Sequence, residues 1–311
     1  MSRIDTPAIA VVGPTASGKT ALGMALARRF HGEIITCDAL QVYRHTDIGT
    51  AKPDGRDRSL VPHHLLDVRE PCDDFSAGDY LRLARRALAG IRERGTVPFV
   101  VGGTGFYLRA LIEGLFRGPG RSEALRARMR GIAARCGPTA IHRALRRVDP
   151  EAAARLAPAD LERNVRAYEI YRVSGRTMTW WQSQPRNRLH GYRWLKLGIS
   201  WPRPLLYARI DRRVEEMFAA GLVAEVASLM AKYPRDCHAF KAIGYRQVAR
   251  HLDGEWSLEE AKEDMQRESR RYAKRQATWF RSDPEIIWLD ATHGENDVLD
   301  KAAGIVAEYL A

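Results

Sequence analysis

Apolar and polar positions along the first 115 residues predict strands that alternate with helices. Apolar runs of strand length are followed by stretches in which apolar residues recur every three or four positions. Strands are expected in 7–13, in the first part of 32–43 and in 96–105, and helices in 19–30, 77–95 and from about 106 to 115. Such alternation indicates a parallel sheet, with the loops that follow its strands gathered at the carboxyl edge.

The pattern changes near residue 118. From there to about residue 190 the chain is rich in alanine and arginine, reads as helical and has no strong strand signal. A strand is predicted again at 192–202. Long helices are expected at about 204–232 and 257–282, followed by a last short strand at 285–291. We therefore predict an α/β fold: a parallel-sheet core of P-loop type, residues 1–118 and 192–311, with an inserted, mainly helical domain, residues 119–191.

Composition supports a large folded core without a membrane segment. Hydrophobic residues make up 45% of the chain, no apolar run approaches about 18 residues, and the first residues lack the layout of a signal peptide. The four cysteines, Cys37, Cys72, Cys136 and Cys237, form no CxxC pair, which argues against a disulfide framework and a cysteine-rich zinc site. We expect a cytoplasmic protein.

Charge is distributed unevenly along the chain. The net charge is +12, and residues 121–191 alone carry 15 arginines, no lysine and 6 acidic residues. An arginine-rich segment suits a partner with a phosphate backbone. A solvated helical surface in an arginine-biased protein is the competing interpretation, and charge alone does not decide between them.

The segment GPTASGKT, residues 13–20, matches the phosphate-binding pattern GxxxxGK[ST]. Its glycines allow a tight loop of backbone N–H groups, the following helix offers its positive end, Lys19 adds a charge, and the Thr20 hydroxyl can bind Mg²⁺. The next apolar strand, within 98–105, ends in glycines rather than the aspartate that orders Mg²⁺ and water in ATPases. The pattern therefore favours a small-molecule kinase or another enzyme that uses a diphosphate.

Two further polar residues are expected at the same edge of the sheet. Asp38 ends the second strand and Thr104 follows another, so both should converge on the glycine loop. A carboxylate there can accept a proton from an attacking nucleophile. A turn or helix-capping role is the alternative for each residue.

Six segments then resemble a known family in their order along the chain. They are GPTASGKT, CDALQVYRHTDIGTAKP (37–53), PHHLLDV (62–68), VVGGTGFYLRALIEGL (100–115), AIGYRQ (242–247) and YAKRQATWFR (272–281). Together they closely resemble tRNA dimethylallyltransferases, which transfer a dimethylallyl group from dimethylallyl diphosphate to N6 of adenine-37 in tRNAs that read codons beginning with U. The resemblance implies that the loop holds the diphosphate of this substrate rather than ATP, with Mg²⁺ as cofactor and the tRNA anticodon stem-loop as partner. It also implies a monomer without membrane contact.

The resemblance assigns roles to individual residues. Catalysis is expected from Asp38, as the base that takes the N6 proton, and from Thr104, Lys19 and Arg213. Diphosphate binding is expected from Gly13, Pro14, Thr15, Ala16, Ser17, Gly18, Lys19, Thr20 and Arg213. Contacts with tRNA are expected from Asp38, Ala39, Leu40, Gln41, Thr104, Arg126, Glu162, Arg163, Asn164, Val165, Arg166, Lys241, Ala242, Ile243, Gly244, Tyr245, Arg246, Lys274, Arg275, Gln276, Ala277, Thr278, Trp279, Phe280 and Arg281.

Basic and aromatic residues interleave in 267–281, which suits phosphates and stacked bases, although such aromatics also serve as helix core. The adenine must leave its stack to reach the sheet edge, and Gln41 is a candidate reader of its edge. Ala39 stands where the family commonly has serine, and no cysteine follows residue 281 to form the zinc finger of eukaryotic relatives, so we expect a bacterial form. Three alternatives stay open: a small-molecule kinase, an adenylate isopentenyltransferase that uses free nucleotides, and a non-catalytic RNA-binding module.

Overall fold

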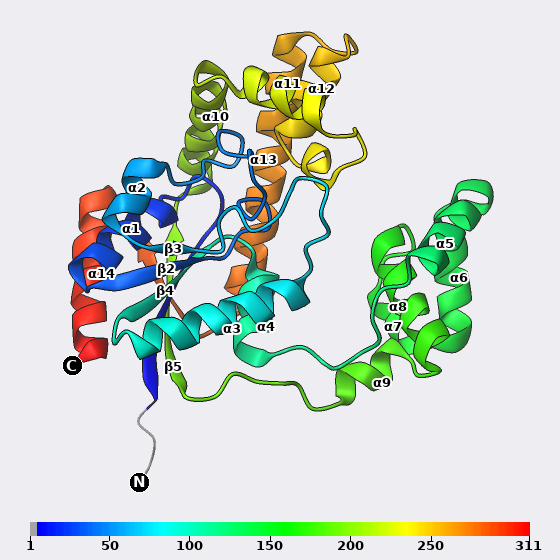
Figure 1. Ribbon diagram of the computed structural model, residues 1–311, viewed down its shortest axis with the longest axis horizontal. Helices are drawn as coiled ribbons and strands as arrows, with labels where there is room; N and C mark the ends of the chain where they lie inside the picture. The colour runs from blue at the N-terminus through cyan, green and yellow to red at the C-terminus, as the bar shows by residue number, and fades with distance from the viewer. Residues whose placement is uncertain (1–4) are drawn as a thin grey trace. The chain divides into compact units, whose positions relative to one another are not determined.

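A parallel six-stranded sheet organises the computed structural model, which describes residues 5–311 (Figure 1). The strand order is β3-β2-β4-β1-β5-β6, and every neighbouring pair is parallel. The strands are β1 (Thr6–Val12), β2 (Gly32–Thr36), β3 (His63–His64), β4 (Val97–Gly102), β5 (Tyr192–Ser200) and β6 (Ile286–Asp290). The α/β fold and the parallel sheet expected from the sequence are confirmed.

Helices cover both faces of the sheet, which is why β1 is apolar at successive positions. Ile9 and Val11 pack with α1 (Lys19–Arg29) and α14 (Glu295–Leu310) on one face, while Ala10 and Val12 pack with α3 (Ala77–Glu93) and α4 (Gly105–Glu113) on the other (Figure 1). The first turn of α3 is fixed by a capping box between Ser76 and Asp79.

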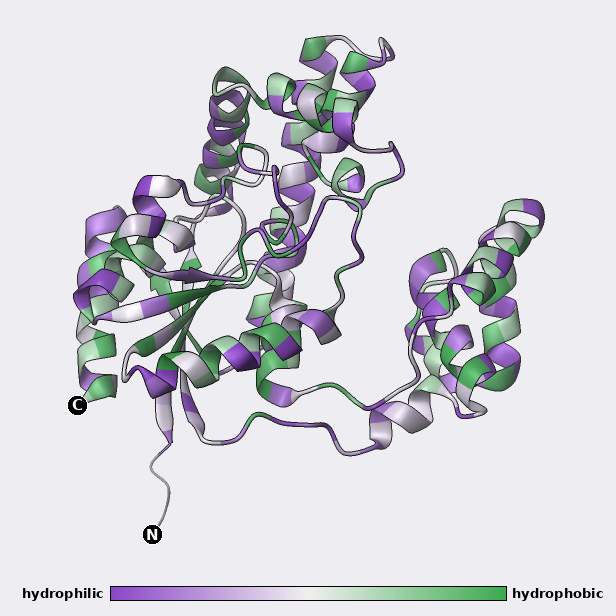
Figure 2. Cartoon of the chain, viewed as in Figure 1, coloured by the Kyte–Doolittle hydropathy of each residue, from purple (hydrophilic) through white to green (hydrophobic). Residues whose placement is uncertain are grey.

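A group of helices from the C-terminal half builds a second apolar cluster beside the carboxyl edge of the sheet. It comprises α10 (Arg203–Ala219), α11 (Leu222–Lys232), the 3₁₀ turn η1 (His238–Lys241), α12 (Tyr245–Leu252) and α13 (Leu258–Arg281). Figure 2 shows green and purple segments on these helices, as amphipathic helices have. The short α2 (Gly55–Leu60) precedes β3.

The chain divides into two compact units. One comprises residues 1–112 and 189–311, and the other comprises residues 113–188, compared with the expected insertion at 119–191. The second unit contains only helices: α5 (Glu123–Cys136), α6 (Thr139–Val148), α7 (Pro150–Arg155), α8 (Leu161–Ser174) and α9 (Met178–Ser183).

Several local expectations need correction. The helix expected at 204–232 is broken at Gly221, whose φ of 100° ends α10 and begins α11. The second strand ends at Thr36, so Asp38 lies in the following turn rather than at the strand end. Helices α12 and α14 were not predicted from the sequence.

The prediction against disulfide bonds was also wrong. Cys72 and Cys237 form a disulfide between residues 165 positions apart, while Cys37 and Cys136 are free. The bond joins the loop before α3 to the start of η1, where Asp74 also contacts His238 at 2.7 Å. Sequence spacing gave no sign of this pair because the fold alone brings the two loops together.

Thiol counting checks this disulfide. We expect a thiol reagent to label only the exposed Cys136 in the native protein, and Cys37 as well after denaturation without reductant. Reductant should then release Cys72 and Cys237. Four labelled thiols in denatured, unreduced protein would disprove the bond.

Candidate active site

The loop between β1 and α1 has the geometry of an anion cradle. Gly13 (φ 154°) and Gly18 (φ 93°) adopt backbone conformations that favour glycine, and a Cβ on Gly13 would lie 2.8 Å from Ser17 Oγ. Gly18 caps α1 without a side-chain hydrogen bond, and no acidic residue occupies the first turn. The first N–H groups of α1 thus face no competing carboxylate from that turn.

Side chains from distant elements brace this loop from outside. Trp201 Nε1 donates to the Ser17 carbonyl at 3.0 Å, and Arg209 Nε donates to the Ala16 carbonyl at 2.9 Å. Arg209 also lies over the Trp201 ring at 4.4 Å and pairs with Glu295 of α14 at 2.7 Å. Both loop carbonyls are thus satisfied before any ligand binds, which fixes the shape of the loop.

A second set of hydrogen bonds ties together the loops after β1, β2 and β4. The buried amide of Gln276 accepts from Thr15 N–H at 2.8 Å and donates to the Gly103 carbonyl at 2.9 Å. Thr104 Oγ1 accepts from Ala39 N–H at 3.1 Å. A Cβ on Gly103 would lie 2.2 Å from Gln276 Nε2, so only glycine at this position leaves room for the contact.

These loops enclose a cavity of about 300 Å³ within the sheet-containing unit. The sequence-predicted residues that line it are Thr15, Ala16, Lys19, Thr20, Asp38, Leu40, Gln41, Arg213, Lys241, Ala242, Ile243 and Gln276. Tyr272 also lines it and belongs to the segment 267–281, whose aromatics were expected to suit stacked bases. Ser269, Met217 and Met265 line it as well and were not predicted as site residues. Thr104 is not among the lining residues and contributes through its bond to Ala39.

Asp38 combines the two roles that the sequence left open. Its Oδ1 accepts from the N–H groups of Leu40 at 2.8 Å and Gln41 at 3.4 Å, which makes it a turn residue. Its Oδ2 makes no hydrogen bond to any residue between 5 and 311. One oxygen thus orients the carboxylate while the other is available to a substrate in the cavity.

Two cations share the cavity with this carboxylate. Burial, followed by the charge of Arg213, lowers the pKa of Lys19 to about 8, while Asp38 opposes the shift. Burial also lowers the pKa of Arg213, again opposed by Asp38. Lys19 Nζ donates to the Pro14 carbonyl at 3.1 Å. Desolvated cations with so little compensation favour binding of an anion.

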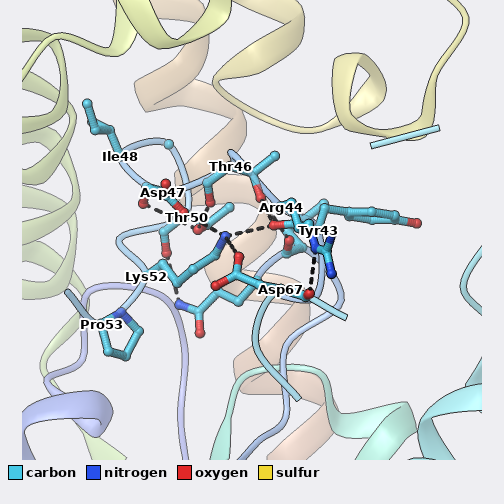
Figure 3. Close-up of polar contacts among 12 residues, drawn as sticks. Tyr43, Arg44, Thr46, Asp47, Ile48, Thr50, Lys52, Pro53 and Asp67 are labelled. Atoms are coloured by element: carbon cyan, nitrogen blue, oxygen red, sulfur yellow. Dashed lines mark hydrogen bonds and ion pairs between the residues drawn. The ribbon is translucent and has the colours of Figure 1, made fainter. Parts of the chain in front are cut away.

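The segment after Gln41 is built around a buried lysine that sequence reasoning missed (Figure 3). Lys52 Nζ donates to the Tyr43 carbonyl at 2.7 Å, to Asp47 at 2.7 Å and to Asp67 at 2.8 Å. Arg58 reaches the other oxygen of Asp67 at 2.6 Å. The only sequence signal was the motif DIGTAKP, which carries both Asp47 and Lys52.

The side chain of Gln41 is hydrogen-bonded to this same segment. Its amide nitrogen donates to the carbonyls of Thr50 at 3.1 Å and Ala51 at 3.3 Å. Only its amide oxygen is left to accept from a ligand, which suits an amino group better than a ring nitrogen.

The expected tRNA-binding residues other than Asp38 and Gln41 differ in exposure. Exposed ones are Glu162, Arg163, Lys241, Arg246, Lys274, Arg275, Thr278 and Arg281; partly exposed ones are Ala39, Leu40, Thr104, Arg166, Ile243, Ala277 and Trp279. Buried ones are Arg126, Asn164, Val165, Ala242, Gly244, Tyr245, Gln276 and Phe280.

The buried members are engaged in internal contacts. Arg126 forms a two-pronged ion pair with the fully buried Glu169 at 2.9 and 3.0 Å. Phe280 packs in the core, and its partly exposed neighbour Trp279 lies under Arg109 at 4.4 Å. Their side chains position exposed neighbours in the same segments.

The chain is similar to known proteins over most of its length. The IPP transferase family model matches residues 41–283. A tRNA dimethylallyltransferase of Syntrophobacter fumaroxidans is 48% identical over 94% of this chain and 86% of its own, and one of Koribacter versatilis is 48% identical over 95% and 96%. Among solved structures, the tRNA isopentenylpyrophosphate transferase of Bacillus halodurans superimposes with a TM-score of 0.72 at 38% identity, covering 98% of this chain and 96% of that one. A eukaryotic dimethylallyltransferase acting on tRNA gives a TM-score of 0.79 at 27% identity, covering 97% and 77%.

Fold and site together define an α/β enzyme core with a cationic cavity at the carboxyl edge of a parallel sheet. The chain belongs to the IPP transferase family. Between residues 5 and 311, no helix has the length and apolar character that crossing a membrane requires.

The low pKa of Lys19 predicts how anion binding depends on pH. Lys19 is charged below about pH 8 and neutral above it, so affinity of the free enzyme for inorganic diphosphate should fall as pH rises through this value. The loss should approach tenfold per pH unit, because one proton is linked to binding. Calorimetric titration between pH 6.5 and 9.5 measures it.

The control is Lys19→Arg, whose side chain stays charged over this range. Its profile should retain only the pH dependence of diphosphate itself. The same slope in both proteins would rule out Lys19 as the titrating group.

Proposed function

We propose that this chain transfers a dimethylallyl group from dimethylallyl diphosphate to N6 of adenine-37 in tRNAs that read codons beginning with U, releasing diphosphate. The observation that carries the proposal is the arrangement of Lys19, Arg213 and Asp38 around one cavity. The cations suit a departing diphosphate, and the free oxygen of Asp38 suits the N6 proton. Family membership and the names of the relatives support the choice of substrates.

The proposed reaction balances within this cavity. The bond between allylic carbon and oxygen breaks with its electrons on the diphosphate, which Lys19, Arg213 and the first N–H groups of α1 stabilise. N6 bonds to the allylic carbon and gives its proton to Asp38.

Thr20 fits the role of a magnesium ligand. Thr20 lines the cavity, and its hydroxyl makes no hydrogen bond to residues 5–311. Mg²⁺ prefers oxygen ligands from a few protein groups, phosphates and water. Thr20 would hold Mg²⁺, which would supply positive charge to stabilise the leaving group.

For the tRNA we propose contacts from the exposed basic residues of α13 and of the helical unit. Lys274, Arg275 and Arg281 project from α13, and the side chain of Arg163 is 72% exposed on α8. Their density suits an anticodon stem-loop, with the adenine extruded into the cavity. We propose that the enzyme acts as a monomer and, since its substrate is tRNA, in the cytoplasm.

A transfer assay with Asp38→Asn tests the chemistry. Asparagine keeps the oxygen that accepts from Leu40 N–H but is not a base, so kcat should fall by about 10²- to 10⁴-fold while tRNA affinity stays within about twofold. Labelled dimethylallyl diphosphate is offered with unmodified tRNA, with tRNA lacking adenine at position 37, and with free AMP.

Wild-type transfer to AMP but not tRNA would favour an adenylate isopentenyltransferase. Phosphorylation from ATP without any prenyl transfer would favour a kinase. Equal loss of affinity and turnover in Asp38→Asn would assign Asp38 to binding instead of catalysis.

Salt dependence tests the tRNA surface. Arg163→Ala and Arg275→Ala should each weaken tRNA binding severalfold with kcat little changed, and should reduce the slope of log Kd against log salt by about 1. Arg28→Ala, which removes an exposed arginine of α1 outside these surfaces, is the matched control. A slope that matches this control would exclude the tested residue from the interface.

A further inference from the structure

One carboxylate outside the cavity holds an entire loop of the site. Glu225 of α11 accepts from the N–H groups of Asp47 at 3.0 Å and Ile48 at 2.7 Å through Oε2. Through Oε1 it accepts from Gly49 N–H at 3.1 Å and from the Tyr245 hydroxyl at 2.6 Å. Three consecutive backbone donors converge on one charged group, which strengthens each bond.

Tyr245 also holds the loop in place, because its ring packs closely against Gly49. Its ring is fully buried, and a Cβ on Gly49 would lie 2.6 Å from it. Only glycine lets the loop approach the ring this closely. The 47–49 loop, which is neither helix nor strand, is therefore fixed from outside by α11 and α12.

The anchored loop leads directly to the cavity. The next residue, Thr50, accepts through its carbonyl from Gln41 Nε2 at 3.1 Å and from Arg213 Nη2 at 3.4 Å. Within residues 5–311 this is the one hydrogen bond that Arg213 makes. Where Thr50 lies thus decides where the Arg213 guanidinium points.

We propose that Glu225 is a positioning residue for the transfer reaction. It fixes the 47–49 loop and thereby the position of Thr50, whose carbonyl orients the side chains of Arg213 and Gln41 toward the substrates. Glu225 itself does not line the cavity. The role rests on the proposed function, since it acts through the residues assigned there to diphosphate and tRNA. Glu225 lies 176 residues or more from the loop that it holds, and nothing in its own segment marks it.

Glu225→Gln is the direct test. A glutamine places an amide N–H against backbone donors and removes the charge, so the loop should loosen. We expect the Kd for inorganic diphosphate to rise about tenfold and kcat for prenyl transfer to fall about tenfold. Glu225→Asp, which keeps the charge, should recover part of both and serves if the glutamine variant does not fold.

Two controls separate positioning from stability. Glu33→Gln removes another buried carboxylate, which binds Arg94, Thr96 and His64 at the opposite end of β2. It should lower the melting temperature and leave the diphosphate Kd unchanged. Tyr245→Phe removes one bond to Glu225 and keeps the three backbone bonds, so its effect on the Kd should stay below that of Glu225→Gln.

A double mutant tests whether Glu225 acts through Arg213. Because Glu225 acts through Arg213, Glu225→Gln should change the diphosphate Kd less than twofold when Arg213→Met is already present. Fully additive effects, or a wild-type Kd in a destabilised Glu225→Gln protein, would overturn the proposal. Absence of prenyl transfer to tRNA by the wild-type enzyme would instead reject the proposed function. The diphosphate Kd values would still show whether Glu225 positions Arg213.

Discussion

The structure depends on keeping two cations desolvated beside a single carboxylate. Lys19 and Arg213 repel each other and have lost much of their hydration, and Asp38 offsets only part of that cost. Such an arrangement persists only where the surrounding chain fixes it. The same cost favours binding of an anion, since a diphosphate supplies the missing negative charge.

The surrounding chain fixes the site through side chains that never face the cavity. Arg209 and Trp201 hold the glycine loop, Gln276 ties it to the turn after β4, and Glu225 holds the loop that orients Arg213. Each contact joins a loop of the first 115 residues to a residue beyond position 200. The C-terminal part of the core therefore acts as a rigid frame around loops that would otherwise be free to move.

Elements with a strong local pattern could be predicted, and those without one could not. The apolar runs of β1, β4, β5 and β6 and the periodic stretches of α3 and α13 produced correct predictions. The break at Gly221 was not predicted because apolar periodicity continues across it. The Cys72–Cys237 bond was not predicted because it depends on two loops meeting in space. Motif and strand order predicted Lys19, Thr20 and Asp38, which line the cavity. Lys52 and Glu225 were not predicted, because only the structure shows the partners that they bind.

The sequence by itself determined the parallel sheet, the glycine loop and the chemical types gathered at its edge, because periodicity and glycine placement are local properties of the chain. Only the tertiary structure decided which oxygen of Asp38 is free, how Gln41 is occupied, and which of the motif residues are exposed. The loops that carry these residues are held by bonds between distant segments, such as the one between Thr15 and Gln276, which lie 261 positions apart. Such bonds form only once the sheet and its covering helices have packed.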